Sequence, residues 1–272
     1  MYESFFSLTQ KPFALTSNPR FLYLSPRHKE ALAHLIYGIK ERLGFIQITG
    51  EVGTGKTTLC RALLNQLDEK TKTAFIFNSN LTERQLMQTI AADLGIPMNG
   101  KNRSDLFQEL NRFLIEQLTL NNNVVVILDE AQNLSNRLLE RIRMLSNLEA
   151  GNEKLLQIIL VGQPELRDKL KSPELRQLRQ RIAVRYHIEA LDEENIPLYI
   201  KHRLKLASTN GSAPIFEKAA FHHIMRYSTG IPRLINILCD KALLTAYVLE
   251  QKTIDETIIQ RCITEIEGGD PA

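Results

Sequence analysis

Residues 50–57 constrain the fold of this chain more than any other stretch, because they fit the pattern G-x-x-x-x-G-K-[ST] without departure. A short apolar run leads into them at residues 45–49, and a helical pattern follows them. Glycines in such a loop let successive backbone N–H groups face inward around phosphates, and the start of the helix adds a favourable dipole. The motif predicts a phosphate-binding loop between a strand and a helix, rather than a plain connecting turn.

Roles within this loop follow from the same chemistry. We expect Lys56 to reach the β- and γ-phosphates of a nucleotide, and the Thr57 hydroxyl to ligate Mg²⁺. The predicted nucleotide-binding residues are those of the motif and the threonine that follows it, namely Gly50, Glu51, Val52, Gly53, Thr54, Gly55, Lys56, Thr57 and Thr58.

A second apolar run, residues 124–128, ends in the acids Asp129 and Glu130. A buried strand followed by two solvated acids is an equally good interpretation of this run taken alone. Beside a phosphate loop, the acids are better explained as the second half of the site, because Mg²⁺ at phosphates needs carboxylate support. We expect Asp129 to hold the metal together with Thr57. Glu130 is predicted to orient and deprotonate the attacking water.

The order of apolar runs predicts an α/β fold. Strand patterns at residues 45–49, 74–77, 124–128 and 157–161 alternate with helical patterns up to about residue 188, which favours a parallel sheet with helices on both faces. After Asp192 strand patterns almost disappear. Helices are expected there over residues 193–208, 216–228, 232–250 and 255–267. We therefore predict an α/β domain over residues 1–189, with an extended aromatic arm at its start, and a helical subdomain over residues 190–272.

Three further side chains are weaker candidates. Gln163 follows the strand at 157–161, where a polar group can contact the γ-phosphate or the attacking water, or serve only as a turn residue. Asn78 ends the strand at 74–77 and is a candidate partner of Glu130. Arg233 follows Pro232 at a sharp helix start and either faces the nucleotide or merely begins that helix.

Basic residues gather between positions 167 and 185. They are Arg167, Lys169, Lys171, Arg176, Arg179, Arg181 and Arg185. Three interpretations stay open for this cluster: a solvated helix face, a nucleic-acid footprint, or an arginine that stabilises the γ-phosphate in a neighbour's site.

Composition excludes several classes of protein. The net charge of +3 over 272 residues does not identify a nucleic-acid binder, and no run approaches the roughly 20 apolar residues of a membrane helix. The N-terminus lacks a signal-peptide pattern, and three widely spaced cysteines indicate reduced, mostly buried thiols. The histidines lack metal-ligand spacing. These features predict a cytoplasmic protein without a direct membrane span.

Taken together, the motifs resemble those of AAA+ ATPases. In that comparison the phosphate loop is Walker A, residues 124–130 are Walker B, Gln163 is sensor 1, and Arg233 is sensor 2. The resemblance implies a P-loop AAA+ core with a parallel sheet flanked by helices, and a C-terminal all-helical lid. It also implies ATP hydrolysis with Mg²⁺, for which the catalytic residues are Lys56, Glu130, Gln163 and Arg181.

Longer segments are similar to one bacterial branch. Residues 18–25, 50–61, 129–134 and 160–166 look like the general-secretion-pathway A ATPases (ExeA-like) and the M-type ATPase of mannose-sensitive haemagglutinin pilus biogenesis. This resemblance implies an ATP-dependent homo-oligomer that assembles or positions an envelope machine, such as a secretin or a type IV pilus. Envelope components would be its partners, and they would recruit a cytoplasmic protein to the inner membrane.

The chain departs from that branch at some positions. Secretion-pathway A members continue into a membrane span and a peptidoglycan-binding domain, so we expect either the shorter pilus-type form or a piece of a longer chain. Glutamine stands at 163 where asparagine or threonine is commoner. Arg179 and Arg181 both fit the arginine finger, and Arg181 is favoured because it directly precedes the strand-like residues 182–188.

Two other functions remain open. The first is a DNA-binding AAA+ helper of the transposition or replication-loading type, in which the basic residues 167–185 would face DNA. The second is a module that does not hydrolyse ATP and in which ATP binding only sets the conformation.

Overall fold

The computed structural model describes residues 1–16, 18–77, 81–97, 103–146, 148–150, 153–208 and 214–268. Packing divides the chain into two units. The larger unit contains Pro26–Gly50 and Leu59–Ile188, and the smaller unit contains Met1–Ser25, Glu51–Thr58 and Glu189–Ala272. These units are defined by packing alone. The predicted functions of the two ranges, nucleotide binding for residues 1–189 and a lid for residues 190–272, stay predictions.

A five-stranded parallel sheet forms the larger unit. Its strands are β1 (Phe45–Gly50), β2 (Thr71–Ile76), β3 (Asn123–Leu128), β6 (Gln157–Gly162) and β7 (Ile182–Ile188). The strand order is β2-β3-β6-β1-β7, with every neighbouring pair parallel. β1 and β6 are buried along their whole length, which explains their continuous apolar sequence. The carboxyl ends of the strands meet at one edge, where the segments after β1, β3 and β6 begin.

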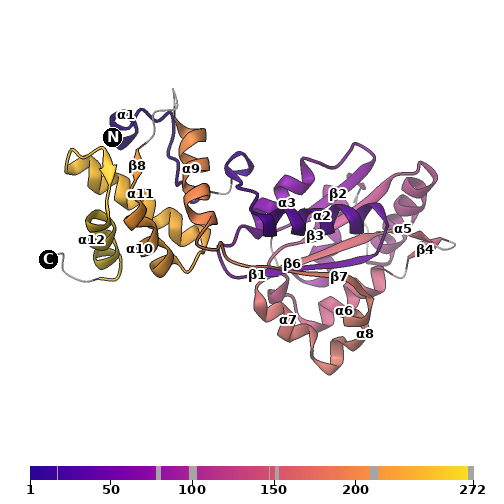
Figure 1. The fold of residues 1–272 in the computed structure, drawn as a ribbon. Coiled ribbons are helices and arrows are strands. Elements are labelled where there is room, and N and C mark those ends of the chain that lie inside the picture. Colours follow the sequence, from indigo (N-terminus) through magenta and orange to yellow (C-terminus); the bar gives the residue numbers. More distant parts are fainter. Residues whose placement is uncertain are drawn as a thin grey trace. The chain divides into compact units, whose positions relative to one another are not determined.

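The helices of this unit follow the strands in the predicted alternation. They are α2 (Pro26–Lys40), α3 (Lys56–Leu64, whose first turn belongs to the smaller unit), α4 (Glu83–Asp93), α5 (Arg103–Thr119), α6 (Asn136–Leu145), α7 (Pro164–Leu170) and α8 (Arg176–Arg181). α2 and α3 lie on one face of the sheet, and α6, α7 and α8 lie on the other (Figure 1). This arrangement confirms the predicted sheet with helices on both faces.

Some elements of the larger unit follow directly from local sequence signals, and others do not. A capping box begins α4, because Thr82 and Gln85 exchange side chain-to-backbone hydrogen bonds of 2.9 and 3.3 Å. The short helices α7 and α8 are additional to the predicted elements. So is a hairpin of β4 (Glu149–Ala150) and β5 (Glu153–Lys154).

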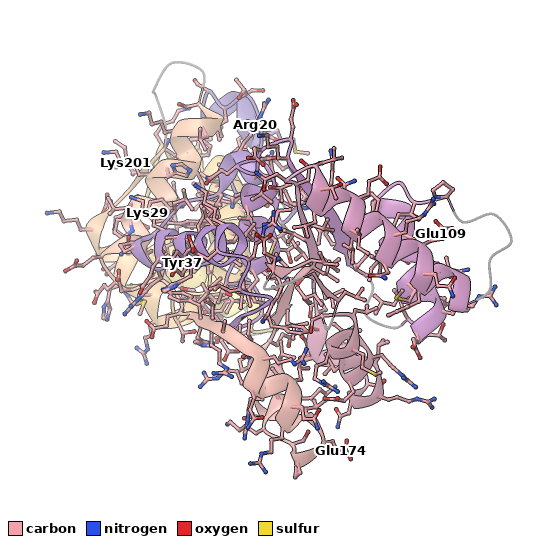
Figure 2. The ribbon with its side chains drawn as sticks, turned by 90° about the vertical axis from the view of Figure 1, so that its right-hand side faces the viewer. Arg20, Lys29, Tyr37, Glu109, Glu174 and Lys201 are labelled. Carbon is pink, nitrogen blue, oxygen red and sulfur yellow. The ribbon has the colours of Figure 1, made fainter. Side chains whose placement is uncertain are left out.

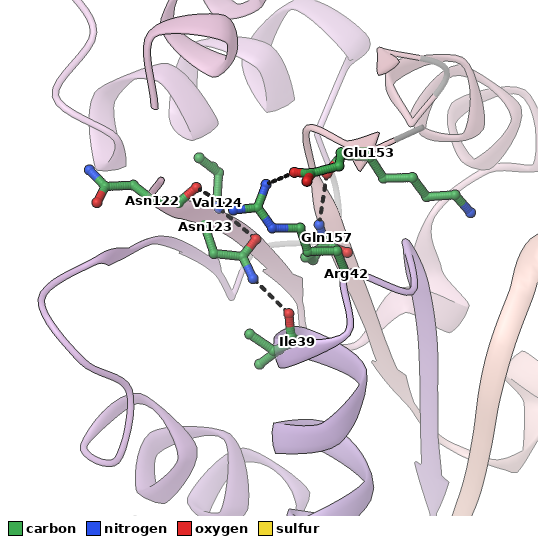
Figure 3. A network of polar contacts seen from close by, with 8 residues as sticks. Ile39, Arg42, Asn122, Asn123, Val124, Glu153 and Gln157 are labelled. Atoms are coloured by element: carbon green, nitrogen blue, oxygen red, sulfur yellow. Dashed lines mark hydrogen bonds and ion pairs between the residues drawn. The ribbon is translucent and has the colours of Figure 1, made fainter. Parts of the chain in front are cut away.

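A polar network ties the amino ends of the strands together, at the edge opposite the carboxyl ends (Figure 3). Arg42 donates to Glu153 Oε2 at 2.8 Å and to the carbonyl oxygen of Asn122 at 3.2 Å. Asn123 Nδ2 donates to the carbonyl oxygen of Ile39 at 2.6 Å. The network therefore joins the end of α2 to the start of β3 and to the hairpin strand β5.

Four helices dominate the smaller unit, as expected. They are α9 (Asn195–Ala207), α10 (Lys218–Ser228), α11 (Pro232–Val248) and α12 (Glu256–Ile266). A short parallel pair, β8 (Ile215–Phe216) and β9 (Thr253–Ile254), joins the segments before α10 and α12. Within the described residues, no helix combines the length and apolar character needed to cross a bilayer.

The aromatic arm at the N-terminus packs into this helical core. It contains α1 (Tyr2–Phe5) and η1 (Pro19–Phe21), so it differs from the extended segment expected from its prolines. Phe6 and Phe13 are 4% and 1% exposed and belong to the same hydrophobic cluster as the apolar faces of α9–α12. Because these rings are buried there, residues 1–25 pack with residues 189–272 in one unit. The sequence pattern alone places residues 1–25 with the α/β domain.

A buried arginine holds the arm on α9. Arg203 is 8% exposed, and its Nε donates to the carbonyl oxygen of Pro12 at 2.6 Å. Its Nη1 donates to the Tyr199 hydroxyl at 3.0 Å, and the guanidinium lies over the Phe21 ring, 5.0 Å from the centroid. Because a buried cation needs such partners, the backbone of the arm and Arg203 depend on each other for hydrogen bonding.

All three cysteines are free and buried, as the sequence predicts. Burial raises the pKa of the Cys239 and Cys262 thiols, which keeps both protonated and poorly reactive at neutral pH.

Substitution of Gly230 by alanine tests the tightest backbone contact in the smaller unit. Gly230 has φ +77°, and a Cβ there would lie 1.9 Å from the carbonyl oxygen of Leu191, which cannot rotate away. We expect Gly230→Ala to lower the free energy of unfolding by more than about 2 kcal/mol, as measured by urea denaturation. Gly95→Ala is the control, because φ is +73° but no atom lies within 4 Å of the added methyl, so about 1 kcal/mol is expected. Equal losses in the two variants would contradict the proposed clash.

Candidate nucleotide-binding site

The phosphate loop has the backbone that its glycines predict. Gly53 and Gly55 have φ of +86° and +96°, a region that side chains other than glycine rarely adopt. Lys56 is only 6% exposed, and its Nζ donates to the carbonyl oxygen of Glu51 at 2.9 Å. The Thr54 hydroxyl donates to the same carbonyl oxygen at 2.9 Å. The Glu51 carbonyl oxygen therefore accepts from two side chains of the loop, and it holds the Lys56 ammonium against the loop's own backbone.

Arg233 contacts this loop within the smaller unit. Its backbone N–H donates to the carbonyl oxygen of Gly53 at 3.3 Å. A Cβ added at Gly53 would lie 2.5 Å from the Cβ of Arg233 and 3.2 Å from Cγ2 of Ile231. Only glycine at position 53 leaves room for the first turn of α11. The structure thus brings Arg233 to the phosphate loop, although its role toward a nucleotide stays a prediction.

The two acids lie at the carboxyl end of β3. Asp129 is 4% exposed, its backbone N–H donates to the carbonyl oxygen of Ile76, and its Oδ1 accepts from the Glu130 N–H at 2.9 Å. Glu130 has φ +52°, in the left-handed region, and begins the short helix η2 (Ala131–Asn133). This turn of the backbone separates the two carboxylates, so that Asp129 is buried and Glu130 is half-buried.

Two glutamine amides hold the Glu130 carboxylate. Gln132 Nε2 and Gln163 Nε2 both donate to Glu130 Oε2, at 2.6 and 3.0 Å. Gln132 Oε1 in turn accepts from the backbone N–H of Gln163 at 3.1 Å. The three side chains form a closed ring of hydrogen bonds across β3 and β6, which fixes the carboxylate in one orientation.

Sequence reasoning missed Gln132. No pattern in the sequence marks Gln132 as a partner of Glu130. The short helix η2 turns the Gln132 side chain back toward Glu130. Lys169 of α7 secures that turn, because its Nζ donates to the carbonyl oxygens of Gln132 and, at 2.8 Å, Leu134. Gln163, which is predicted to contact the γ-phosphate or the attacking water, donates to Glu130 in the structure. Asn78, the predicted partner of Glu130, lies outside the described residues.

The residues present fit a nucleotide and Mg²⁺ by their donor chemistry. The loop offers a buried lysine, positive-φ glycines and a helix N-terminus, which suit a phosphate chain. Thr57 and Asp129 offer a hydroxyl and a carboxylate, the oxygen ligands that Mg²⁺ prefers.

The two candidate arginine fingers have different surroundings. Arg181 is half-buried, and its Nη1 donates to Ser146 Oγ at 3.1 Å within the same chain. Arg179 is exposed, and its carbonyl oxygen accepts from Arg185. The choice of Arg181 as the finger stays a prediction.

The middle of α2 is mixed in its exposure to solvent. Tyr37 is 58% exposed on α2 (Figure 2), whereas Gly38 and Ile39 are buried against the sheet. Among the described residues, no three acidic, histidine or cysteine side chains cluster as ligands for a structural metal.

Alanine at position 162 tests the ring around Glu130. A Cβ at Gly162 would lie 2.7 Å from Gln132 Oε1 and 2.9 Å from Leu166 Cδ2, so it would push the amide away from Gln163. We expect Gly162→Ala to speed hydrogen exchange of the Gln163 backbone amide at least about tenfold, the effect of losing roughly one hydrogen bond. Gln132→Ala should give the same change without any clash at Leu166. Unchanged exchange in both variants would show that the ring does not form in solution.

Comparison with known proteins agrees with this architecture. Residues 39–170 match the family model described as AAA domain. Drosophila ORC bound to DNA has a TM-score of 0.71 at 18% identity, covering 95% of this chain and 65% of that chain. ORC2 of Aeropyrum pernix in its ADPNP–ADP complexes has a TM-score of 0.68 at 17% identity, covering 95% and 72%. At these identities the likeness concerns the fold, and it confirms the predicted AAA+ α/β core followed by helices.

A curated relative extends the match in sequence. The chain is 44% identical to general secretion pathway protein A of Aeromonas hydrophila over 269 residues, which are 98% of this chain and 49% of the relative. The chain thus spans about half the length of that protein. Residues 39–170 thus match the AAA domain, and over almost its whole length the chain is similar in sequence to general secretion pathway protein A, a similarity that agrees with the phosphate loop and the acids after β3.

Proposed function

We propose that this protein binds ATP with Mg²⁺ and hydrolyses it. The observation that carries the proposal is the order of segments at the carboxyl edge of the sheet. The phosphate loop follows β1, Asp129 and Glu130 follow β3, and Gln163 follows β6, the strand between those two. Ligands of open parallel sheets bind at this edge, which supports the proposal that the three segments act on one nucleotide.

Binding is assigned to the loop. Lys56 would exchange its bond to the Glu51 carbonyl oxygen for the β- and γ-phosphates, whose charge compensates a buried ammonium far better than a neutral acceptor does. The backbone N–H groups of residues 50–58 would surround the phosphates. Thr57 and Asp129 would hold Mg²⁺, which neutralises charge on the phosphate oxygens when bound.

Hydrolysis is assigned to Glu130. Its carboxylate would accept a proton from the water that attacks the γ-phosphorus, while the bond from that phosphorus to the leaving ADP oxygen breaks. Gln132 and Gln163 both donate to Oε2, so they orient the carboxylate about that oxygen. Arg233 would report the state of the nucleotide to the helical residues 190–272, which we propose act as the lid.

Glu130→Gln separates binding from chemistry. We expect ATP turnover to fall about 10²- to 10⁴-fold, since a general base is lost, while ATP binding stays within about twofold of wild type. The variant should also accumulate ATP-bound oligomers, seen by light scattering. Lys56→Ala is the contrasting variant, and its Kd for ATP should rise about 10- to 100-fold through loss of a charged hydrogen-bond donor. Wild-type turnover in Glu130→Gln would refute the assignment of the base.

Arg181 is proposed to complete the site of a neighbouring protomer. Within its own chain its Nη1 donates to Ser146 Oγ, and a phosphate oxygen is a stronger acceptor for a guanidinium than a hydroxyl is. This assignment makes activity depend on an ATP-induced homo-oligomer.

Mixing two inactive variants tests a role in trans. Arg181→Ala alone should lose about 10³-fold in turnover. Mixing it with Lys56→Ala should restore part of the activity, because the second variant supplies an intact arginine to the first one's site. Arg179→Ala serves as the matched control and should keep turnover near wild type. If Arg179→Ala is the variant that complements Lys56→Ala, the finger is Arg179, and if neither does, no arginine of this segment acts in trans.

The cellular role is proposed from the relative. Because that protein carries the name general secretion pathway protein A, we propose that ATP hydrolysis here serves the assembly or positioning of an envelope machine, either a type II secretion apparatus or a pilus of the mannose-sensitive haemagglutinin or type IV kind. The protein would work in the cytoplasm and be recruited to the inner membrane by envelope partners.

A DNA-binding AAA+ helper is the second candidate. The observation that favours it is the exposure of Arg167, Arg176, Arg179 and Arg185 on one stretch of chain. Exposed arginine side chains bind the phosphate groups of a nucleic-acid backbone by charge attraction.

A further inference from the structure

A cationic pocket of about 450 Å³ opens at the β1–β7 side of the sheet in the larger unit. Arg167 and Lys171 come to it from α7 and the residue after it, Arg179 from α8, and Arg185 and His187 from β7. α7 and α8 lie on the face opposite α3, the helix that the phosphate loop begins (Figure 1). All residues that line the pocket belong to the larger unit, and none of them is among those assigned to nucleotide binding or to activation of the attacking water.

Strand register places polar side chains on the floor of this pocket. Gln47 of β1 pairs with Arg185 of β7, and Thr49 pairs with His187. Because side chains alternate along a strand, these four lie on one face, and Thr49 Oγ1 lies 3.0 Å from His187 Nδ1. Tyr186, between the two β7 residues, has its hydroxyl bonded to Glu30 of α2 on the other face.

The floor is unusual for the middle of a sheet. Gln47 is 4% exposed and Thr49 is 1% exposed, in a strand where the neighbouring Ile46 and Ile48 are fully buried. A buried amide costs free energy unless it has hydrogen-bond partners. A ligand in the pocket would supply such a partner to Gln47.

The charges around the pocket have one sign. No aspartate or glutamate is among the described residues that line it, and the nearby Asp168 is paired with Lys171 at 2.7 Å. Positive charges gathered around one small volume repel each other, and an anion removes that repulsion. Arginine side chains in particular present planar forks of donors that fit phosphate oxygens.

We propose that this pocket is a second anion site, which binds a small phosphate-bearing ligand up to the size of a mononucleotide. A phosphate with several charged oxygens can accept from Arg167, Arg179 and Arg185 together, and its outer atoms can reach the neutral donors of the floor. The volume lies in the range of small-molecule sites, which is about 300–1,000 Å³. The proposal concerns binding and does not rest on ATP hydrolysis.

Pyrophosphate is the probe, in a Lys56→Ala background that weakens the phosphate loop. We expect isothermal titration calorimetry at moderate salt to detect pyrophosphate binding to Lys56→Ala. A further Arg185→Gln or Arg167→Gln change should raise Kd at least about tenfold, the effect of a lost charged hydrogen bond. Arg176→Gln is the matched control, because Arg176 is exposed on the same helix as Arg179 but does not line the pocket, so Kd should stay within about twofold.

Titrations with ADP and with duplex DNA distinguish the possible sources of the phosphate. Tighter binding of ADP than of pyrophosphate indicates a nucleotide, and the reverse indicates a free phosphate compound. The proposal is wrong if Lys56→Ala binds no pyrophosphate, or if Arg176→Gln weakens binding as much as Arg185→Gln. It is also wrong if duplex DNA alone binds in an Arg185-dependent manner, which would favour the nucleic-acid candidate. Equal melting temperatures of the variants establish that each is folded.

Discussion

The parallel pairing of β1, β6 and β3 is the constraint on which the rest of this structure depends. Three segments that are distant in sequence begin at one edge because their strands run the same way in adjacent positions. That edge gives Glu130 its partner Gln163, since β6 lies directly beside β3. At the opposite edge, the Arg42 network joins α2 to β3 and to β5, next to the start of β6. Each end of the sheet therefore has its own set of polar side chains. The set around Arg42 joins structural elements, and the set around Glu130 orients the carboxylate that we propose as the general base.

Much of this architecture is predictable because it rests on local signals. The phosphate loop, the strand that ends in Asp129 and Glu130, and the helix starting at Pro232 are each encoded within a few residues. The ring around Glu130 is not local in this sense. It requires the left-handed turn at Glu130, the short helix η2 and the lysine of α7, none of which has a strong periodic pattern. Gln163 was identifiable from its place after a strand, whereas Gln132 had no comparable signal.

The N-terminal arm shows a different limit of sequence reasoning. Its prolines and aromatic residues indicate an irregular segment, but they do not indicate which core receives the rings. The place where the rings are buried depends on two features of the smaller unit. Helices α9–α12 provide the apolar surface, and Arg203 donates hydrogen bonds to the backbone of the arm. The polar floor beneath α7 is similar, because Gln47 in an apolar strand is visible in the sequence, but the arginines that surround it come from three separate elements. Tertiary neighbours, which a linear pattern does not specify, decide both cases.

The hydrogen bond from Arg203 to Pro12 spans 191 residues of chain. A ribosome releases the arm long before it releases the helices that bury Phe6 and Phe13. During that interval the aromatic rings have no native partner, while the larger unit can already assemble from residues that are close in sequence. The arm is therefore the part of this protein most dependent on late events in synthesis, and the most exposed to chaperones or to misassociation before α9 is complete.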